Sequence, residues 1–248
     1  MSLSKRTSLL KKLQTELPRG APFNTRALRG IGVSAALAWR YVHSGWLQSL
    51  GRGLYMFPND QLDRDACLKF LSSTVPGLHV GGKTALAWRG VRHNVAFRET
   101  LTLLGDVSTR LPDWFTSHFP SSYAARHLFS HDVPKDFGLQ TLPQTPQGPV
   151  VSERERALLE MLSGVGLTQE VEEARNTMEG LYTLRPEVLE TLLKACVSVK
   201  VVRLCVQWSD ELGLPWAATA RQAVAGRSGK NRWSSRMRNG KTLVLKPA

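Results

Sequence analysis

The sequence predicts an α+β protein with an N-terminal winged helix-turn-helix domain and a larger mixed α/β C-terminal domain. Three observations indicate this fold class: a basic first segment with short helical patterns and a Gly-rich hairpin, an abrupt change of charge along the chain, and a long helical region after residue 150. The 248 residues, 42% of them hydrophobic, are enough for one large domain or two ordinary ones. We place the domains at residues 1–60 and 61–248.

The charge of the chain is high and unevenly distributed. A formal net charge of +13 favours an acidic partner such as nucleic acid or an anionic membrane surface, although a basic enzyme stays an alternative. Residues 1–57 hold nine Lys or Arg and one acid, whereas residues 152–190 hold nine Glu and four Arg. Residues 221–248 hold eight basic residues and no acid. The two basic segments, residues 1–57 and 221–248, are therefore candidate nucleic-acid contacts.

Membrane and metal signals are weak. No apolar run approaches the ~20 residues of a spanning helix, and the N-terminus interleaves Lys and Arg with Leu, unlike a signal peptide. Cys67, Cys196 and Cys205 include no CxxC pair, so neither a disulfide framework nor a zinc knuckle is indicated. We expect a cytoplasmic protein with buried, reduced thiols and no cofactor or metal.

The first segment has the element order of a helix-turn-helix. Leucines recur at helical spacing over residues 3–17, and "LPRG" ends that helix. Asn24 or Thr25 can cap a short helix that ends at Gly30 or Gly32, and Ser34 begins a third helix closed by Gly45. Two short helices joined by a tight Gly-containing turn predict this DNA-binding motif.

A hairpin is expected directly after the third helix. In "WLQSLGRGLYMF" (46–57), two apolar runs flank Gly51-Arg52-Gly53, which is typical of a β-hairpin. The hairpin makes the motif a winged one, with Arg52 at the tip, where it can approach phosphate or enter a minor groove.

Helical geometry assigns the faces of the third helix. Val33, Leu37, Tyr41 and Ser44 should pack on the core, while Ala35, Trp39 and His43 lie opposite, with Ala36, Ala38 and Arg40 on the flanks. Small residues near the helix start allow close approach to a major groove. The alternative is a winged helix used only for protein contacts. The expected DNA contacts of this domain are Arg26, Ser34, Ala35, Ala38, Trp39, Arg40, His43 and Arg52.

The C-terminal region mixes strands and helices. "TLTLLGDV" and "KTLVLKP" read as strands, "LPQTPQGPV" as a loop, and residues 153–212 as mostly helical. "SVKVVRLCVQW" has the Val content of a strand, but Leu204, Trp208 and Leu212 continue at helical spacing, so we predict a helix. The glutamates of residues 153–190 are expected on a solvated helical face, and a scaffold that binds protein through this acidic region is an alternative function.

Residues Gly77–Thr84, "GLHVGGKT", match the phosphate-loop pattern GxxxxGK[ST]. A phosphate loop needs a strand before it and a long helix after it. Here a helical pattern ended by Pro76 precedes the motif, and Gly90 cuts the following helix short. We therefore expect no strand to enter the loop, a tight turn at Gly81 and Gly82, and a Lys83 on a solvated surface or at the DNA backbone. Nucleotide binding stays an alternative.

Other catalytic patterns are missing from the sequence. His127 and His131 could share a face and ligate a metal, but no third ligand follows at a suitable spacing. HExxH, GxSxG and a framed pair of catalytic carboxylates do not occur. We assign no catalytic residue and expect a protein that is not an enzyme.

The basic tail "RSGKNRWSSRMRNGK" (227–241) is a second candidate DNA contact. Trp233 stands among Arg232, Arg236 and Arg238. Such a stretch can be a solvated terminus or can hold the DNA backbone beside the winged helix.

Three segments resemble the AbiEi-type antitoxins, the transcriptional regulators of type IV (abortive infection) toxin–antitoxin systems. These are "LRGIGVSAALAWRYVHSGWLQSLGRGLYMF", "HVGGKTALAWRGV", and "VSERERALLEML" with "MEGLYTLRPEVLETLLKACVSVKVVRLCVQWSDELGLPW". The resemblance spans nearly the whole chain and thins between Gly105 and Gln147. Each motif is a pattern of apolar and turn residues, so their order carries the resemblance.

The resemblance implies a function. The N-terminal domain would bind double-stranded promoter DNA at inverted repeats and repress the toxin–antitoxin operon. The C-terminal domain would oppose a nucleotidyltransferase-like toxin without a stable complex. The resemblance does not account for the basic tail.

Overall fold

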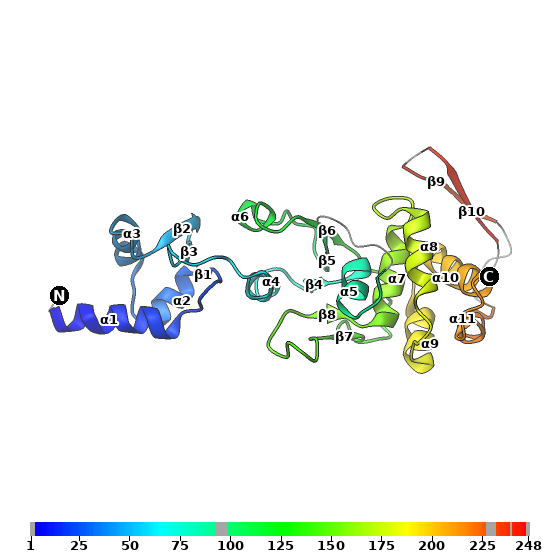
Figure 1. The fold of residues 1–248 in the computed structure, drawn as a ribbon, viewed down its shortest axis with the longest axis horizontal. Helices are drawn as coiled ribbons and strands as arrows, with labels where there is room; N and C mark the ends of the chain where they lie inside the picture. Colours follow the sequence, from blue (N-terminus) through cyan, green and yellow to red (C-terminus); the bar gives the residue numbers. More distant parts are fainter. Residues whose placement is uncertain (1–2, 93–98, 227–231, 239, 247–248) are drawn as a thin grey trace. The chain divides into compact units, whose positions relative to one another are not determined.

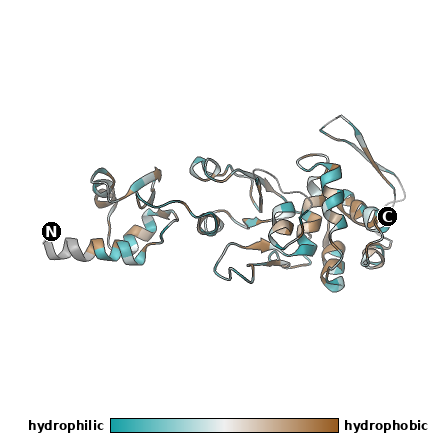
Figure 2. Ribbon diagram, viewed as in Figure 1, coloured by the Kyte–Doolittle hydropathy of each residue, from teal (hydrophilic) through white to brown (hydrophobic). Residues whose placement is uncertain are grey.

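The computed structural model describes residues 3–92, 99–226, 232–238 and 240–246, which form two compact units (Figure 1). The N-terminal unit is Met1–Thr74 with Leu111–Phe119, and the C-terminal unit is Val75–Arg110 with Pro120–Ala248. Hydrophobic residues, brown in Figure 2, occur in both units, and each unit buries a core of its own. The fold is α+β, as the sequence predicts.

The N-terminal unit is a winged helix. Its elements are α1 (Leu3–Glu16), β1 (Phe23–Asn24), α2 (Thr25–Gly30), α3 (Ala35–His43), β2 (Gln48–Gly51), β3 (Leu54–Met56), α4 (Arg64–Ser72) and α6 (Asp113–Thr116). The antiparallel sheet has the order β1-β3-β2, with Phe23 opposite Tyr55 and Ser49 opposite Tyr55. Helices α1 to α4 and the hairpin lie where the sequence predicts them, whereas β1 and α6 were not predicted.

Short polar side chains start both helices of the helix-turn-helix. The Asn24 side chain accepts a hydrogen bond from the Ala27 N–H (3.0 Å), and the Ser34 hydroxyl accepts one from the Leu37 N–H (3.3 Å). These caps satisfy N–H groups that have no partner within their own helix. Between the helices, the Val33 N–H donates to the Leu28 carbonyl (2.9 Å) and closes the turn.

Apolar residues from α1, β1, α2, α3 and the wing segment meet in one N-terminal core. Phe23, Leu28, Val33 and Leu47 are at most 2% exposed, and Phe23 packs against Phe57 with ring centroids 5.4 Å apart. Burial of side chains of this size contributes roughly 1.5–3 kcal/mol each. This cluster fixes α3 against the sheet and thereby sets which of its faces stays exposed.

The N-terminal unit extends beyond the boundary that we expected after residue 60. Asp60 accepts hydrogen bonds from Arg19 and from the Gly20 N–H (2.9 Å), which ties the segment after the wing to the start of the sheet. In α4 and α6, Phe70 and Trp114 stack edge to face at 6.3 Å. Contacts between residues far apart in sequence set this limit, so no local composition shift marks it.

The C-terminal unit contains a five-stranded mixed sheet in the order β6-β5-β4-β8-β7. Its strands are β4 (His79–Val80), β5 (Leu101–Gly105), β6 (Ser121–Ala125), β7 (Leu139–Gln140) and β8 (Val151–Ser152). The β4·β8 and β5·β6 pairs are parallel, and the β4·β5 and β7·β8 pairs are antiparallel.

Helices surround one buried helix in this unit. The helices are α5 (Gly82–Trp88), α7 (Arg154–Gly164), α8 (Val171–Glu179), α9 (Pro186–Ala195), α10 (Val199–Glu211) and α11 (Ala217–Val224). Nine of the eleven residues of α7 are buried, and α5, α8, α9 and α10 all contact it. The Val-rich segment is helix α10, as predicted, because Leu204 and Trp208 pack into this core. A hairpin of β9 (Trp233–Arg236) and β10 (Thr242–Leu245) follows.

The cysteines are buried, as expected from the sequence. Cys67, Cys196 and Cys205 are buried and form no disulfide, and burial raises the pKa of Cys67 to about 12. Within the described residues, no helix combines the length and apolar character needed to cross a bilayer.

Candidate nucleic-acid interface

Helix α3 exposes one face and buries the other. Ala35, Trp39 and His43 are exposed, and Trp39 keeps 61% of its surface accessible. Leu37 and Tyr41 lie in the core at 4% and 5% exposure. The predicted division of the helix into a core face and an open face is confirmed for these five residues.

Two residues of α3 lie elsewhere than expected. Ala38 is completely buried, so its expected role as a DNA contact is wrong. At 100° per residue, Ala38 is about 60° from Tyr41 and therefore falls within the core stripe. Ser44, expected in the core, is exposed, because the helix ends at His43 and the Ser44 hydroxyl donates to the Arg40 carbonyl (2.8 Å).

The exposed aromatic pair on α3 is preorganised. The Trp39 and His43 rings lie with centroids 3.8 Å apart and planes at 35°. His43 Nδ1 is 2.9 Å from the Trp39 carbonyl oxygen, and because a carbonyl only accepts, Nδ1 is the donor. His43 Nε2 is thus left for an external partner. A flat, ordered ring pair on an open helix face suits contact with sugar and base edges.

The wing tip is fastened to the start of α2. The Thr25 N–H and hydroxyl both donate to the Gly53 carbonyl, at 3.0 and 3.2 Å. Gly53 has φ +71°, and a Cβ there would lie 2.9 Å from the Thr25 hydroxyl oxygen, so a side chain at this position is disfavoured. Arg52 therefore projects from a tip of defined backbone, and its side chain is exposed.

The cations near this face are uncompensated. Arg26, Arg40 and Arg52 are exposed, and among the described residues none of them pairs with a carboxylate. Arg19, by contrast, pairs with Asp60 and lies over the Phe57 ring at 4.5 Å. Burial raises the pKa of Asp60, but the hydrogen bonds from Arg19 and Gly20 outweigh it and lower the pKa. The sequence count of basic residues could not separate these two kinds of arginine.

The phosphate-loop pattern has a different structure from a phosphate loop. Strand β4 lies inside the motif, between Gly77 and Gly81, so the expectation that no strand enters it is wrong. The β4 strand leaves only Gly81 before α5 begins at Gly82, and α5 ends at Trp88. A phosphate loop needs several consecutive N–H groups between strand and helix, and this turn is too short to provide them.

A carboxylate already lies at the start of α5. The Gly82 N–H donates to Glu160 Oε2 (3.1 Å), and a Cβ on Gly81 would be 2.5 Å from the same oxygen. Lys83 pairs with Glu173 at 3.1 Å. The position where an anion would meet the helix terminus is therefore taken by Glu160 of α7.

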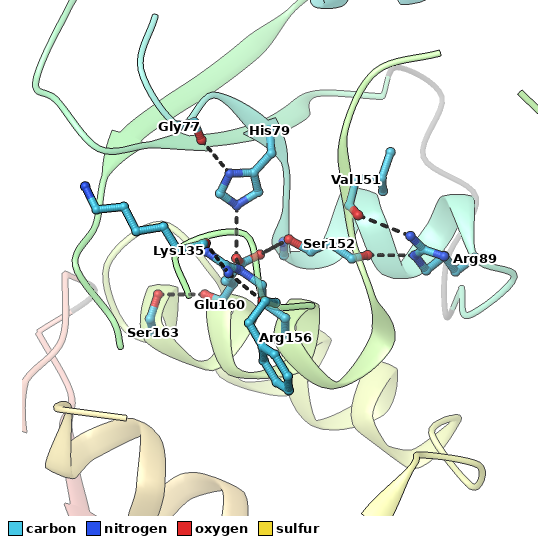
Figure 3. Close-up of polar contacts among 11 residues, drawn as sticks. Gly77, His79, Arg89, Lys135, Val151, Ser152, Arg156, Glu160 and Ser163 are labelled. Carbon is cyan, nitrogen blue, oxygen red and sulfur yellow. Dashed lines mark hydrogen bonds and ion pairs between the residues drawn. The ribbon is translucent and has the colours of Figure 1, made fainter. Parts of the chain in front are cut away.

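Figure 3 shows the residues that converge on Glu160. His79 Nε2 and Arg156 Nε donate to Glu160 Oε1 at 3.0 and 2.9 Å, and the Ser152 hydroxyl donates to Oε2 at 2.7 Å. His79 Nδ1 also faces an acceptor, the Gly77 carbonyl oxygen at 2.7 Å. Burial raises the pKa of Glu160, but the charge of His79 and these hydrogen bonds lower it to about 2.

This buried network was missed by sequence reasoning. His79 and Glu160 are 81 residues apart, and no spacing rule connects them. The glutamates of residues 153–190 were expected on a solvated face, which is wrong for Glu155 and Glu160, at 3% and 6% exposure. Glu155 accepts hydrogen bonds from the Arg185 N–H (2.8 Å) and guanidinium (2.8 Å). Two of the nine glutamates of this region are therefore part of the core, while Glu170, Glu172, Glu179 and Glu187 are exposed.

The remaining candidates do not assemble with one another. His127 and His131 are both exposed and lie outside helices and strands. Across the described part of the chain, no group of three or more His, Cys, Asp or Glu could hold a metal ion. In the tail, Arg232, Arg236 and Arg238 are exposed on or beside the β9–β10 hairpin. Residues 227–231 and 239 of the tail lie outside the described residues.

Two family profiles match the chain. One, described as "Transcriptional regulator, AbiEi antitoxin, Type IV TA system", matches residues 98–244. The other, described as "Transcriptional regulator, AbiEi antitoxin N-terminal domain", matches residues 6–97. The chain belongs to the AbiEi antitoxin family. This AbiEi regulator is thus a transcriptional regulator and antitoxin of the type IV toxin–antitoxin class, as its sequence motifs indicate.

A solved structure has a similar fold. The "Crystal structure of RV2827C protein from Mycobacterium tuberculosis" aligns with a TM-score of 0.58 at 15% identity, over 93% of this chain and 84% of that one. At this identity the likeness concerns the fold alone. No curated protein sequence matches the AbiEi regulator.

Proposed function

We propose that this AbiEi regulator represses its own operon by binding inverted repeats in the promoter through α3 and the β2–β3 wing. In this proposal α3 enters the major groove with Ala35, Trp39 and His43, and Arg52 reaches phosphate or the minor groove. Arg26, Arg40 and the Ser34 hydroxyl hold the backbone. Arg232, Arg236 and Arg238 add a second backbone contact from the C-terminal unit.

One observation carries the proposal: the exposed face of a capped, well-packed α3 combines small residues with arginines that lack carboxylate partners. Ala35 and Ala36 are exposed near the helix start, so the α3 backbone can approach base edges closely. Arg40 and Arg52 are exposed and unpaired among the described residues. Ion pairing within the protein would have to be broken before an arginine could bind phosphate, and here no such loss arises.

The antitoxin part of the proposal rests on family membership. In this reading the regulator opposes a nucleotidyltransferase-like toxin without a stable complex, and the C-terminal unit performs that role. A nucleotidyltransferase-like gene beside this one would support the pairing. Co-expression with that gene tests it: growth should be restored with the regulator present, and no stable co-purification should occur. Growth arrest that persists in the presence of folded regulator would contradict it.

The test of DNA binding uses the regulator's own upstream promoter. Arg40→Ala with Arg52→Ala should weaken binding more than tenfold in mobility-shift titrations, because two phosphate contacts are lost. Each lost contact should also reduce the slope of log K against log[salt] by about one unit. The matched control is Arg175→Ala, since Arg175 pairs with Glu211 on the C-terminal unit. Unchanged affinity in the double variant would contradict DNA binding through α3 and the wing.

The nucleotide-binding alternative has less support. Glu160 lies at the α5 N-terminus, and Lys83 pairs with Glu173. Protein binding through the acidic region could not use Glu155 and Glu160, which are buried and paired within the C-terminal unit, and would depend on the exposed Glu170, Glu172, Glu179 and Glu187.

A further inference from the structure

A cavity of about 320 Å³ lies on the sheet of the C-terminal unit. We call it the sheet pocket; strands β5 and β6 form its floor, and the start of α5, helix α7 and the loop after α7 form its walls. Its lining combines apolar side chains with polar ones, which include Thr102, Ser122, Tyr123, Arg126 and Gln169. Ser122 is exposed, so the pocket reaches solvent.

Two cations meet at the end of α7 beside this pocket. Arg126 donates to the Ser163 carbonyl (3.2 Å), and the Lys200 ammonium donates to the Ser163 and Val165 carbonyls (2.7 and 3.0 Å). Both side chains are half-buried, and among the described residues neither pairs with a carboxylate. Burial and the charge of Arg126 lower the pKa of Lys200 to about 8.

The helix end cannot neutralise both cations. The C-terminus of a helix carries roughly half a negative charge, whereas Arg126 and Lys200 together carry two positive charges. Lys200 uses two of its three donors on α7 carbonyls, and a guanidinium offers five donors, of which Ser163 accepts one. Hydrogen bonding to the α7 carbonyls therefore accounts for most of the donors of Lys200. It uses only one of the guanidinium donors of Arg126, so the others can bind a ligand.

The other charges of the sheet pocket are already matched. Glu160 accepts hydrogen bonds from His79, Ser152 and Arg156, and Lys83 pairs with Glu173. Arg126 is thus the only charged group in the lining without a carboxylate or base partner, within the described part of the chain. A pocket with one open arginine fork and several hydroxyls is electrostatically suited to an anion.

We propose that the sheet pocket binds a small phosphate ester on a hydroxyl-bearing frame, with Arg126 as its anchor. The planar fork of arginine matches two phosphate oxygens at once, and the Ser122 and Thr102 hydroxyls supply further donors. A volume near 320 Å³ is at the small end of ligand pockets and suits a sugar phosphate or a nucleoside monophosphate. This site is separate from the DNA-binding face of the N-terminal unit.

The experiment is a thermal-shift titration of the full chain with ribose 5-phosphate, adenosine monophosphate and inorganic phosphate, without magnesium. A ligand of the folded state raises Tm by mass action, and a concentration of ten times Kd should give a shift of about 3 °C. We expect the two phosphate esters to act at lower concentration than inorganic phosphate. The ester that binds more tightly shows whether the pocket prefers a sugar phosphate or a nucleoside monophosphate.

Two variants test the anchor in different ways. Arg126→Ala removes the fork, and Ala124→Leu fills the pocket while keeping Arg126 at the end of α7. Both should abolish the shift, and Arg126→Lys should weaken it about tenfold because a single ammonium replaces the fork. Folding of each variant is checked by circular dichroism, and Ala124→Leu keeps the test valid if Arg126→Ala does not fold.

The N-terminal variant separates this site from the DNA face. Arg40→Ala with Arg52→Ala should keep the ligand shift, and Arg126→Ala should keep promoter binding. No shift in the wild-type chain with any of the three compounds would overturn the proposal. A shift that survives in both Arg126→Ala and Ala124→Leu would overturn it equally.

Discussion

Arginines of this AbiEi regulator occur in two settings, and a pair of examples from each unit shows the contrast. In the N-terminal unit, Arg40 and Arg52 are exposed and lack carboxylate partners among the described residues. In the C-terminal unit, Arg156 is largely buried against Glu160, and Arg185 holds Glu153 and Glu155. The basic residues behind the net charge of +13 therefore have two different roles. Unpaired arginines make a surface that attracts anions, while paired ones hold the core together.

The difference has a consequence for substitutions. Removing an unpaired surface arginine should change binding and leave stability within about 0.5 kcal/mol. Removing a member of a buried pair should do the reverse, because its partner stays buried without compensation. Substitutions in the two units should therefore differ in whether they change binding or stability.

The largest effect is expected for Glu160→Ala. This change leaves His79 and Arg156 without their shared carboxylate, and loss of a buried partner costs about 3–5 kcal/mol of the free energy of unfolding. Chemical denaturation followed by tryptophan fluorescence measures it. Glu160→Gln is the matched control, since it keeps the volume and one acceptor and should cost less. A loss under 1 kcal/mol in Glu160→Ala would show that the network is not a core element.

Acid should weaken the C-terminal unit through the same residue. The pKa of Glu160 is lowered to about 2 by its partners, so the carboxylate stabilises the fold above its unfolded pKa. That stabilisation, of order a few kcal/mol, should be lost as the pH falls from about 5 to about 2. Urea denaturation at several pH values measures it. The Glu160→Gln variant should have a flatter dependence, and an equally steep one would assign the acid sensitivity to other groups.

A pair of single variants compares the two units directly. Arg185→Ala should cost about 1–3 kcal/mol, because buried Glu155 loses its guanidinium donors and keeps only the backbone N–H of residue 185, and should leave promoter binding unchanged. Arg52→Ala should cost less than about 0.5 kcal/mol and should weaken promoter binding severalfold. Denaturation and mobility-shift titration are run on both. Equal stability losses in the two variants would remove the distinction.

The smallest effect is expected for the tail. Reversing Arg232, Arg236 and Arg238 to Glu should lower DNA affinity in general without changing the preferred sequence, because phosphate contacts carry no base information. Footprint length and salt slope are compared for the full chain and for a truncation near Gly226. Identical footprints and slopes would leave these arginines as solvated surface.

Local sequence patterns were sufficient to predict most elements of the N-terminal unit. The caps Asn24 and Ser34, the apolar stripe of α3 and the Gly-Arg-Gly tip each act over a few residues, so they could be read in order. The same holds for the helices after residue 153, including α10, whose helical spacing outweighed its Val content. Family membership was readable too, since the order of these motifs persists along the chain.

Only the tertiary structure decided what the charged residues do. A sequence gives the number of glutamates and arginines but not their separation in space, and a charge is matched or open according to neighbours that are often dozens of residues away. Glu160 reaches the "GLHVGGKT" turn across 78 residues and takes the place of a phosphate there. Arg126 lies beside the Ser163 carbonyl at the end of α7, 37 residues further along the chain, and pairs with no carboxylate among the described residues. Each outcome depends on long-range packing, for which the local pattern carries no signal.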